Sequence, residues 1–194
     1  PPKVKFNPTL VIHEVTKGDL KRVGEKALDN LVFNLGMIEM LSYWKATASP
    51  EIIIRAGSLN KKQLSWWKDL LLKGMGQYFY ENNIDFTDPS FVRLKSSKKD
   101  SLSPYNKKLE GRTLIPFGGG KDGIVTWQLL KQGDYDITAF VLNANQTHKQ
   151  IFRVGKIEKP ITVTRTIDPA LLKLNRNGYL NGHTPFSAYL AFLT

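Results

Sequence analysis

The chain has 194 residues, 41% of them hydrophobic, which is enough for one large or two small folded domains. No run approaches the roughly 18 apolar residues of a membrane span, and the N-terminus lacks the apolar stretch of a signal peptide. We therefore expect a cytoplasmic protein with no membrane segment. The absence of cysteine excludes disulfides, thiolate metal sites and mechanisms that use a cysteine thioester or persulfide.

The formal net charge of +11 would suit an anionic partner such as nucleic acid. Its distribution weakens that interpretation, because residues 93–108 carry six cations and one anion and so contribute +5. This stretch contains Ser, Pro and Asn and shows no hydrophobic period, which predicts a solvated loop over about residues 87–110. The alternative is a patch that recruits a polyanion or a phosphorylated substrate.

The N-terminal region, residues 1–110, is predicted to be mostly helical with edge strands. The segment up to about residue 21 alternates weakly, which favours one or two edge strands or an arm. Apolar residues at helical spacing predict a helix from Glu25 to Trp44. A short buried strand over residues 51–55 follows the Ser-Pro pair that ends this helix.

A second long helix is predicted after this strand. Asn60 has the character of an N-cap, and Gln63 stands three residues later, as in a capping box. Gly74 and Gly76 lie further along the same helix. They would either thin one face for close packing or allow the helix to bend.

The second region, residues 111–194, alternates strands with helices, which is typical of a parallel sheet covered by helices. Strands are predicted over 113–117, 137–142 and 161–167, a helix over 122–130, and a further segment around residue 150. Asp168-Pro169 and Thr184-Pro185 each have the form of an N-cap followed by a favoured first helical residue. Three strands make a small sheet, so we expect an incomplete sheet and a chain truncated at its C-terminus.

A glycine-rich turn joins the first of these strands to its helix, at Gly118, Gly119, Gly120, Lys121 and Asp122. Glycines allow a tight turn that brings several N–H groups to phosphate oxygens, and the helix N-terminus adds a favourable partial charge. The arrangement predicts an anion cradle. The competing interpretation is a tight strand-to-helix turn with no ligand.

The turn fits neither the Walker A pattern nor Gly-x-Gly-x-x-Gly. It resembles the PP-loop signature Ser-Gly-Gly-x-Asp-Ser of ATP-pyrophosphatases. Gly119 and Gly120 match the two glycines and Asp122 the aspartate, whereas Gly118 and Gly123 stand where the signature has serine. This resemblance implies an α/β fold with a mainly parallel sheet of PP-loop or HUP-like type, preceded by the helical region.

The same resemblance implies roles for the turn in binding ATP. The backbone of Gly119 and Gly120 would hold the pyrophosphate end of ATP, and Lys121 would add positive charge. Asp122 would cap its own helix or help to hold a metal ion. Gly123 departs from the signature, because a hydroxyl expected on the phosphates is absent there.

Beyond the turn, the chain resembles the UDP-N-acetylmuramoyl-L-alanyl-L-glutamate epimerase family of peptidoglycan-precursor enzymes. Four ordered blocks carry this resemblance over about 150 residues, and together they are more specific than any single block. They are residues 41–46 (LSYWKA), 72–82 (LKGMGQYFYEN), 116–122 (PFGGGKD) and 180–188 (LNGHTPFSA). The family also has an Asn-Glu-Arg-Ser-Ala type run, which would follow Thr194.

The resemblance implies an ATP-dependent epimerase in peptidoglycan precursor synthesis. ATP would activate the terminal L-glutamate of the UDP-linked muropeptide as an acyl adenylate, AMP and pyrophosphate would be released, and the glutamate would be inverted. An acyl adenylate is neutral at the carboxyl carbon and loses its α-proton more readily than a carboxylate does. Inversion then needs a base on one face and an acid on the other, and Mg²⁺ would bridge the triphosphate oxygens.

Four residues in the matched blocks are candidates for catalysis or substrate binding. His183 and Asn181 lie in a predicted loop where their side chains could face a ligand, and histidine titrates near neutral pH. Tyr43 and Lys45, at the end of the first long helix, could reach the pyrophosphate or the glutamate carboxylate. The alternatives are a helix-entry hydrogen bond for His183 and interfacial packing for Tyr43 and Lys45.

Arg165 is a charged residue on an otherwise apolar strand, where a charge needs a partner. It would pair with phosphate or with an acid in the core. His13 and His148 are predicted to be surface residues. No cluster of His, Asp and Glu has metal-ligand spacing, so no dedicated protein metal site is predicted.

Two other functions remain open. One is a PP-loop enzyme that adenylates RNA or another acceptor, which the net charge favours. No pattern of stacking aromatic and basic residues marks an RNA surface, however, so nucleic acid is not the expected partner. The other is an inactive nucleotide-binding or interaction module, suggested by Gly123. The sequence does not indicate an oligomeric state.

Overall fold

The computed structural model describes residues 4–96, 102–106, 108–109 and 111–194. The chain forms two compact units, here called the helical unit (Pro1–Phe6, Leu20–Tyr105 and Pro169–Thr194) and the sheet unit (Asn7–Asp19 and Asn106–Asp168). The helix α1 (Lys17–Val23) leads from one to the other. The sequence predicted a single division at residue 110. In the structure the helical unit also includes residues 169–194, and the sheet unit also includes residues 7–19.

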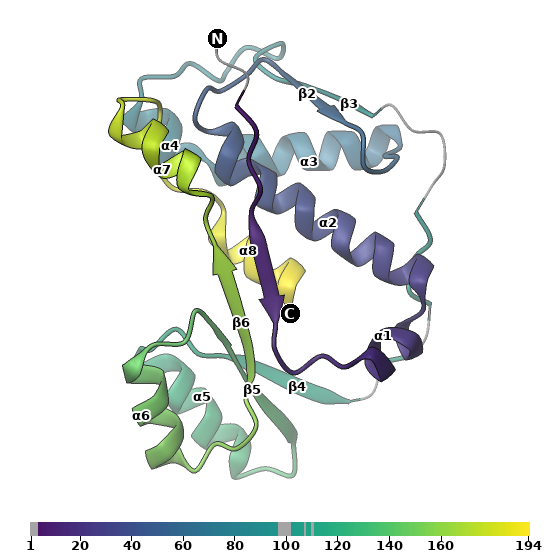
Figure 1. The fold of residues 1–194 in the computed structure, drawn as a ribbon, viewed down its shortest axis with the longest axis vertical. Coiled ribbons are helices and arrows are strands. Elements are labelled where there is room, and N and C mark those ends of the chain that lie inside the picture. The colour runs from purple at the N-terminus through teal and green to yellow at the C-terminus, as the bar shows by residue number, and fades with distance from the viewer. Residues whose placement is uncertain (1–3, 97–101, 107, 110) are drawn as a thin grey trace. The chain divides into compact units, whose positions relative to one another are not determined.

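The helical unit contains several helices and a two-stranded parallel sheet. In this sheet β2 (Glu51–Ile54) pairs with β3 (Arg93–Ser96). Figure 1 shows α3 running beside these two strands. The helices are α2 (Glu25–Trp44), α3 (Lys61–Gly74), α4 (Gly76–Glu81), α7 (Pro169–Arg176) and α8 (Phe186–Leu193).

The core of the helical unit is built around the C-terminal half of α2. Leu41 is 1% exposed and Tyr78 is fully buried. The ring of Trp44 lies 6.2 Å from that of Tyr78 and meets those of Phe79 and Phe91 edge to face. Such tilted aromatic contacts are favourable beyond the area that they bury. The last turn of α2 is thereby fixed against α4.

The two ends of α3 each bear out a prediction. Asn60 and Gln63 form the predicted capping box, with Asn60 N donating to Gln63 Oε1 at 2.9 Å and Gln63 N to Asn60 Oδ1 at 3.0 Å. The predicted long helix is interrupted at Met75, where φ is −113°. A Cβ on Gly74 would lie 2.7 Å from Pro185 Cβ, so the absence of a side chain there permits close packing.

The sheet unit is a four-stranded sheet in the order β1-β6-β5-β4. The strands β4 (Arg112–Pro116), β5 (Asp136–Leu142) and β6 (Ile161–Thr166) are parallel, and β1 (Thr9–Ile12) is antiparallel to β6 at the edge. The crossover helices α5 (Lys121–Lys131) and α6 (Gln146–Gly155) lie side by side (Figure 1). The predicted α/β class with a mostly parallel sheet and an N-terminal edge strand is therefore confirmed.

Three sequence predictions need correction. The helix α1 was not predicted. The strand β3 lies inside the segment that was predicted as a loop; it forms by pairing with β2, and Lys95 makes an ion pair with Glu51 of that strand. The helix α8 has Pro185 rather than Thr184 as its N-cap. Within the predicted basic loop, Lys98, Lys99, Asp100 and Lys107 lie outside the described residues. No helix in the described part of the chain is long and apolar enough to span a membrane.

Candidate functional site

The carboxyl ends of three parallel strands bring the glycine-rich turn and two polar residues to one edge of the sheet unit. Gly118 lies just beyond β4, Asn143 directly follows β5, and Arg165 is the penultimate residue of β6. The three strands are hydrogen-bonded in sequence, so these positions are neighbours along the edge. In open α/β sheets, ligands bind outside the carboxyl ends of the strands, which makes this edge the candidate site.

The glycine-rich turn leaves open space where a ligand would approach. Gly119 has φ +81°, a backbone conformation that favours glycine. A Cβ added to Gly118 or to Gly120 would meet no atom within 4 Å. Gly120 is the N-cap of α5 and makes no side-chain cap, so the first N–H groups of this helix have no cap from that residue. The turn thus has the uncapped helix N-terminus and the dipole of an anion cradle.

Lys121, Asp122 and Gly123 lie in the first turn of α5. Lys121 and Asp122 are exposed, and Asp122 is not the N-cap of the helix. A Cβ on Gly123 would lie 3.2 Å from Phe117 Cδ1 and 3.3 Å from the carbonyl oxygen of Pro116. Glycine at this position therefore fits the close packing of α5 against the end of β4.

Arg165 is half-buried on β6, opposite Leu10 of β1. Its backbone N–H donates to Asn143 Oδ1 at 2.8 Å. Asn143 has φ +53° and its N–H donates to the carbonyl oxygen of Val163 at 2.8 Å. A non-glycine residue with positive φ is uncommon, although asparagine adopts this conformation more readily than most residues, and such residues cluster at functional sites. Asn143 was not singled out from the sequence.

His148 contradicts its prediction as a surface histidine. It is 4% exposed and sits at the start of α6, in a capping box with Asn145. A Cβ on Gly119 would lie 3.5 Å from both Nε2 and Cε1 of His148, so the imidazole borders the glycine-rich turn. The spacing of an N-cap asparagine and a polar residue three positions later was the available signal, but histidine is not the usual partner in a capping box.

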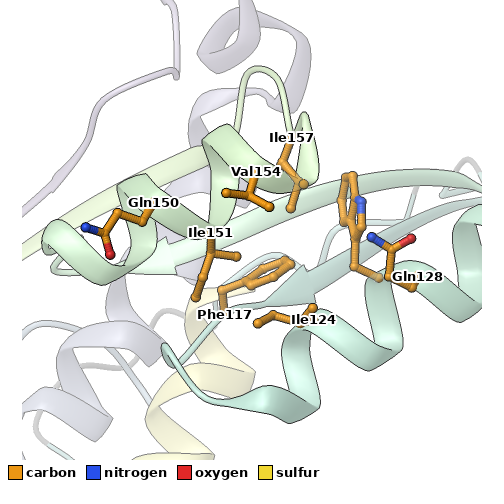
Figure 2. A pocket seen from close by; sticks show the side chains of 9 residues that line it. Phe117, Ile124, Gln128, Gln150, Ile151, Val154 and Ile157 are labelled. Carbon is orange, nitrogen blue, oxygen red and sulfur yellow. The ribbon is translucent and has the colours of Figure 1, made fainter.

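An apolar groove lies between α5 and α6. It has a volume of about 320 Å³, and Figure 2 shows Ile124, Ile151 and Val154 around it. Phe117 connects the groove to the turn, because its side chain lines the groove and its peptide group leads into Gly118. The groove continues the core of the sheet unit, in which Ile115, Phe117, Trp127, Ala139 and Ile157 are buried together.

In the helical unit, hydrogen bonds connect α2 and α4 with the loop before α8. Lys45 Nζ donates to the carbonyl oxygen of Gly182 at 2.7 Å, and Asn82 Nδ2 donates to that of Asn181 at 2.8 Å. The Tyr78 hydroxyl donates to the carbonyl oxygen of Lys45 at 2.7 Å. Burial raises the pKa of the Tyr78 phenol to about 12, which keeps it a hydrogen-bond donor.

These contacts shape a hollow of about 350 Å³ lined by Glu81, Asn181, Gly182 and His183. Two predicted site residues, Asn181 and His183, thus share one hollow with Glu81, which was not predicted. Lys45 is joined to its rim through Gly182.

The other predicted residue of the helical unit, Tyr43, is 7% exposed, and its ring packs 4.8 Å from that of Phe6. These contacts are those of a residue that packs in the core, and the catalytic role of Tyr43 stays a prediction. Among the described residues, no group of three or more His, Cys, Asp or Glu side chains could hold a metal ion.

Comparisons with known proteins place the chain in a family. A model described as the MurL N-terminal domain matches residues 2–194. Three curated relatives are named UDP-N-acetyl-alpha-D-muramoyl-L-alanyl-L-glutamate epimerase. Those of Salinispora tropica, Xanthomonas oryzae and a Micromonospora species are 31%, 27% and 28% identical over 157, 155 and 157 residues.

Each of these alignments covers 79% of this chain but only 33%, 34% and 34% of the relative, so the chain spans about a third of their length. No solved structure matches the chain significantly. The match to the family model, over nearly all of its residues, establishes that this chain belongs to the MurL N-terminal domain family.

Proposed function

We propose that this chain supplies nucleotide-binding and substrate-binding elements of an ATP-dependent epimerase that inverts the terminal L-glutamate of UDP-N-acetylmuramoyl-L-alanyl-L-glutamate. The observation that carries the proposal is the open glycine-rich turn at the carboxyl edge of a parallel sheet, in a chain whose curated relatives are named as this epimerase. The order of strand, glycine turn and helix supports a sheet unit of PP-loop or HUP-like type.

The residues of the turn fit a nucleotide phosphate. The open space at Gly118 and Gly120 would accept phosphate oxygens, and the buried His148 Nε2 has no partner among the described residues. When bound, ATP would supply an adenylyl group to the glutamate carboxylate with loss of pyrophosphate, which makes the α-proton easier to remove. Hydrolysis after inversion would restore the carboxylate and release AMP. The interconversion of L- and D-glutamate does not itself consume ATP. Activation of the carboxylate would explain why the proposed epimerase uses ATP.

The charged residues at the edge have distinct proposed roles. Lys121, exposed in the first turn of α5, would add positive charge for the phosphates. Arg165, held at the edge through its backbone bond to Asn143, would contribute a second cation. Asp122 would help to position Mg²⁺, with the phosphates providing the other oxygens, because the described residues hold no cluster that would bind the ion alone.

The hollow of the helical unit supports a role in proton transfer. Inversion at a carbon atom needs one group that removes a proton and another that returns one to the opposite face. His183 and Glu81 both line the hollow, and both are types of side chain that act as general acids and bases. Asn181 would bind the substrate there, whereas Lys45 would hold the loop by its bond to Gly182.

The test is precursor-dependent release of AMP and pyrophosphate from ATP and Mg²⁺. It is measured with and without UDP-N-acetylmuramoyl-L-alanyl-L-glutamate, on this chain and on the longest reading frame that contains it, and the product is analysed for D-glutamate. Gly120→Ala should weaken ATP binding at least about tenfold, since its methyl group would enter the space that the phosphates occupy.

Gly36→Ala is the matched control, because a Cβ there also meets nothing within 4 Å but lies within α2. It should leave ATP binding unchanged. A folded protein that releases no AMP in the presence of the precursor, in either length, would refute the proposed activity. Binding of ATP without AMP release would instead identify a nucleotide-binding module.

A further inference from the structure

His148 has a buried polar atom that the fold itself does not use. Its side chain is more than nine-tenths buried, and Nε2 is one of three buried side-chain polar atoms without a hydrogen-bond partner in the described residues, with Trp127 Nε1 and Asn175 Oδ1. Most buried polar groups in native proteins are hydrogen-bonded, so an exception requires an explanation. A ligand that is bound in the functional state is one such explanation.

The ring of His148 is held in a fixed orientation by the N-cap of α6. His148 N donates to Asn145 Oδ1 at 3.1 Å, and Asn145 N donates to His148 Nδ1 at 3.2 Å. Nδ1 and Asn145 Oδ1 are also 2.7 Å apart. The Nδ1 edge of the imidazole therefore contacts Asn145, and the Nε2 edge faces away from Asn145.

That opposite edge borders the glycine-rich turn. A Cβ built on Gly119 would lie 3.5 Å from His148 Nε2. The turn follows β4 and His148 follows β5, and the two strands are adjacent in the sheet. Two features that point to a ligand, the open N-terminus of α5 and an unpartnered buried nitrogen, thus meet at Gly119.

The hydrogen bonds at Nδ1 decide what Nε2 can offer. When Nδ1 accepts from Asn145 N, the neutral ring carries its proton on Nε2 and donates from there. When Nδ1 instead carries a proton and donates to Asn145 Oδ1, Nε2 is a donor in the imidazolium form and an acceptor in the neutral ring. A phosphate oxygen only accepts, so it selects the forms in which Nε2 carries a proton beside the backbone N–H groups of the turn.

We propose that His148 Nε2 donates a hydrogen bond to a phosphate oxygen bound on the Gly118–Gly120 turn, which makes His148 a ligand-binding residue of this edge. The inference rests on the proposed nucleotide site, and it adds a side-chain donor to a cradle otherwise made of backbone groups. The ligand class is a phosphate or pyrophosphate group, free or as part of a nucleotide. The bond would also fix the phosphate relative to β5 as well as to β4.

A matched pair of substitutions isolates this donor. Gln and Glu are the usual residues at this position of a capping box, and Gln63 occupies it in α3, so His148→Gln and His148→Glu both preserve the helix start. They are nearly isosteric, but only Gln offers an N–H donor, whereas Glu presents a carboxylate to the anion. His13→Gln and His13→Glu repeat the same change at an exposed histidine of the sheet unit, where Nε2 lies 2.8 Å from Thr164 Oγ1.

The probes are inorganic pyrophosphate and ATP, titrated by calorimetry against the wild-type chain and the four variants. His148→Glu should bind both probes at least about tenfold more weakly than His148→Gln, and the two His13 variants should bind alike. A second measurement, on the wild-type protein, does not require any variant to fold. The chain has three histidines, so long-range ¹H–¹⁵N imidazole spectra should show a shift of His148 Nε2 on addition of pyrophosphate.

The outcomes separate the two proposals. If wild type binds both probes but His148→Glu and His148→Gln bind equally and the Nε2 resonance does not move, the role of His148 is refuted and the nucleotide site stands. If wild type binds neither probe, the nucleotide site is refuted and the role of His148 with it.

Discussion

The Lys45 ammonium and the Gly182 carbonyl form a 2.7 Å hydrogen bond that joins the end of α2 to the loop before α8, residues 137 positions apart. Lys45 is half-buried, so the bond is partly shielded from bulk water. Its donor is charged, and hydrogen bonds of this kind are stronger than neutral ones. The bond fixes the backbone next to His183, one of the residues that line the hollow of the helical unit.

Lys45→Met removes this bond and retains most of the aliphatic stem. The variant should lower the free energy of unfolding by about 1.5–3 kcal/mol, because the Gly182 carbonyl is left without its charged donor. Urea unfolding followed by circular dichroism measures the change. Lys73→Met is the control: its ion pair with Asp69 is exposed, and its loss should cost at most about 0.5 kcal/mol. Equal losses in the two variants would contradict a structural role for Lys45.

Local signals in the sequence predicted much of the helical unit. The apolar spacing of α2 gave a helix with the observed bounds, Glu25–Trp44. The capping box of Asn60 and Gln63 was also predicted correctly, because it depends on residues only three positions apart. By contrast, β3 was missed because two of its four side chains are charged and its strand character comes from pairing with β2, about forty residues earlier in the chain.

The candidate site shows the same division. The glycine-rich turn was predicted because its glycines and its flanking strand and helix are adjacent in sequence. The burial of His148 beside Gly119 was not predicted, because it follows from the pairing of β4 with β5. Glu81 was missed as a site residue for a similar reason, since only the fold of the helical unit brings α4 to the loop at His183.

Two glycine-to-alanine substitutions should have opposite effects in the helical unit. Gly74→Ala places a Cβ 2.7 Å from Pro185 Cβ, so α3 or the start of α8 must shift, and the cost should be about 1–3 kcal/mol. Gly36→Ala, within α2, meets nothing within 4 Å and should stabilise by about 0.5–1 kcal/mol through helix propensity. Thermal unfolding of the two variants checks both signs. A stabilised Gly74→Ala protein would show that Pro185 does not pack as described.

A second pair separates strain from ligand space in the glycine-rich turn. Gly119 has φ +81°, so Gly119→Ala should cost about 1–2 kcal/mol even without a ligand. Gly120 has φ −93° and open surroundings, so Gly120→Ala should leave the unfolding free energy of the unliganded protein nearly unchanged. Urea unfolding without nucleotide measures both. A large loss in Gly120→Ala would mean that the space beside Gly120 is filled by the protein itself.

The Tyr78 phenol gives the stability of the chain a defined alkaline dependence. Burial raises its pKa from 10.0 to about 12, so between these two pH values the folded protein keeps a proton that the unfolded chain has lost. Unfolding then releases a proton, and the free energy of unfolding must fall as pH rises, by at most about 1.4 kcal/mol per pH unit for one group. Below pH 10 the phenol is protonated in both states, and its contribution is fully present.

Comparison with Tyr78→Phe isolates this effect from the other groups that titrate in the same range. Phenylalanine cannot donate to the Lys45 carbonyl, so the variant should be less stable than wild type near neutral pH by about 1 kcal/mol or more. Its stability lacks the Tyr78 titration, so the difference between the two proteins should shrink as pH rises from 10 toward 12. Urea unfolding at several pH values measures this difference. Tyr80→Phe, at a side chain that is 86% exposed, controls for the loss of one phenol. A difference between wild type and Tyr78→Phe that stays constant across this range would contradict the burial of an un-ionised Tyr78 phenol on α4, against the Lys45 carbonyl.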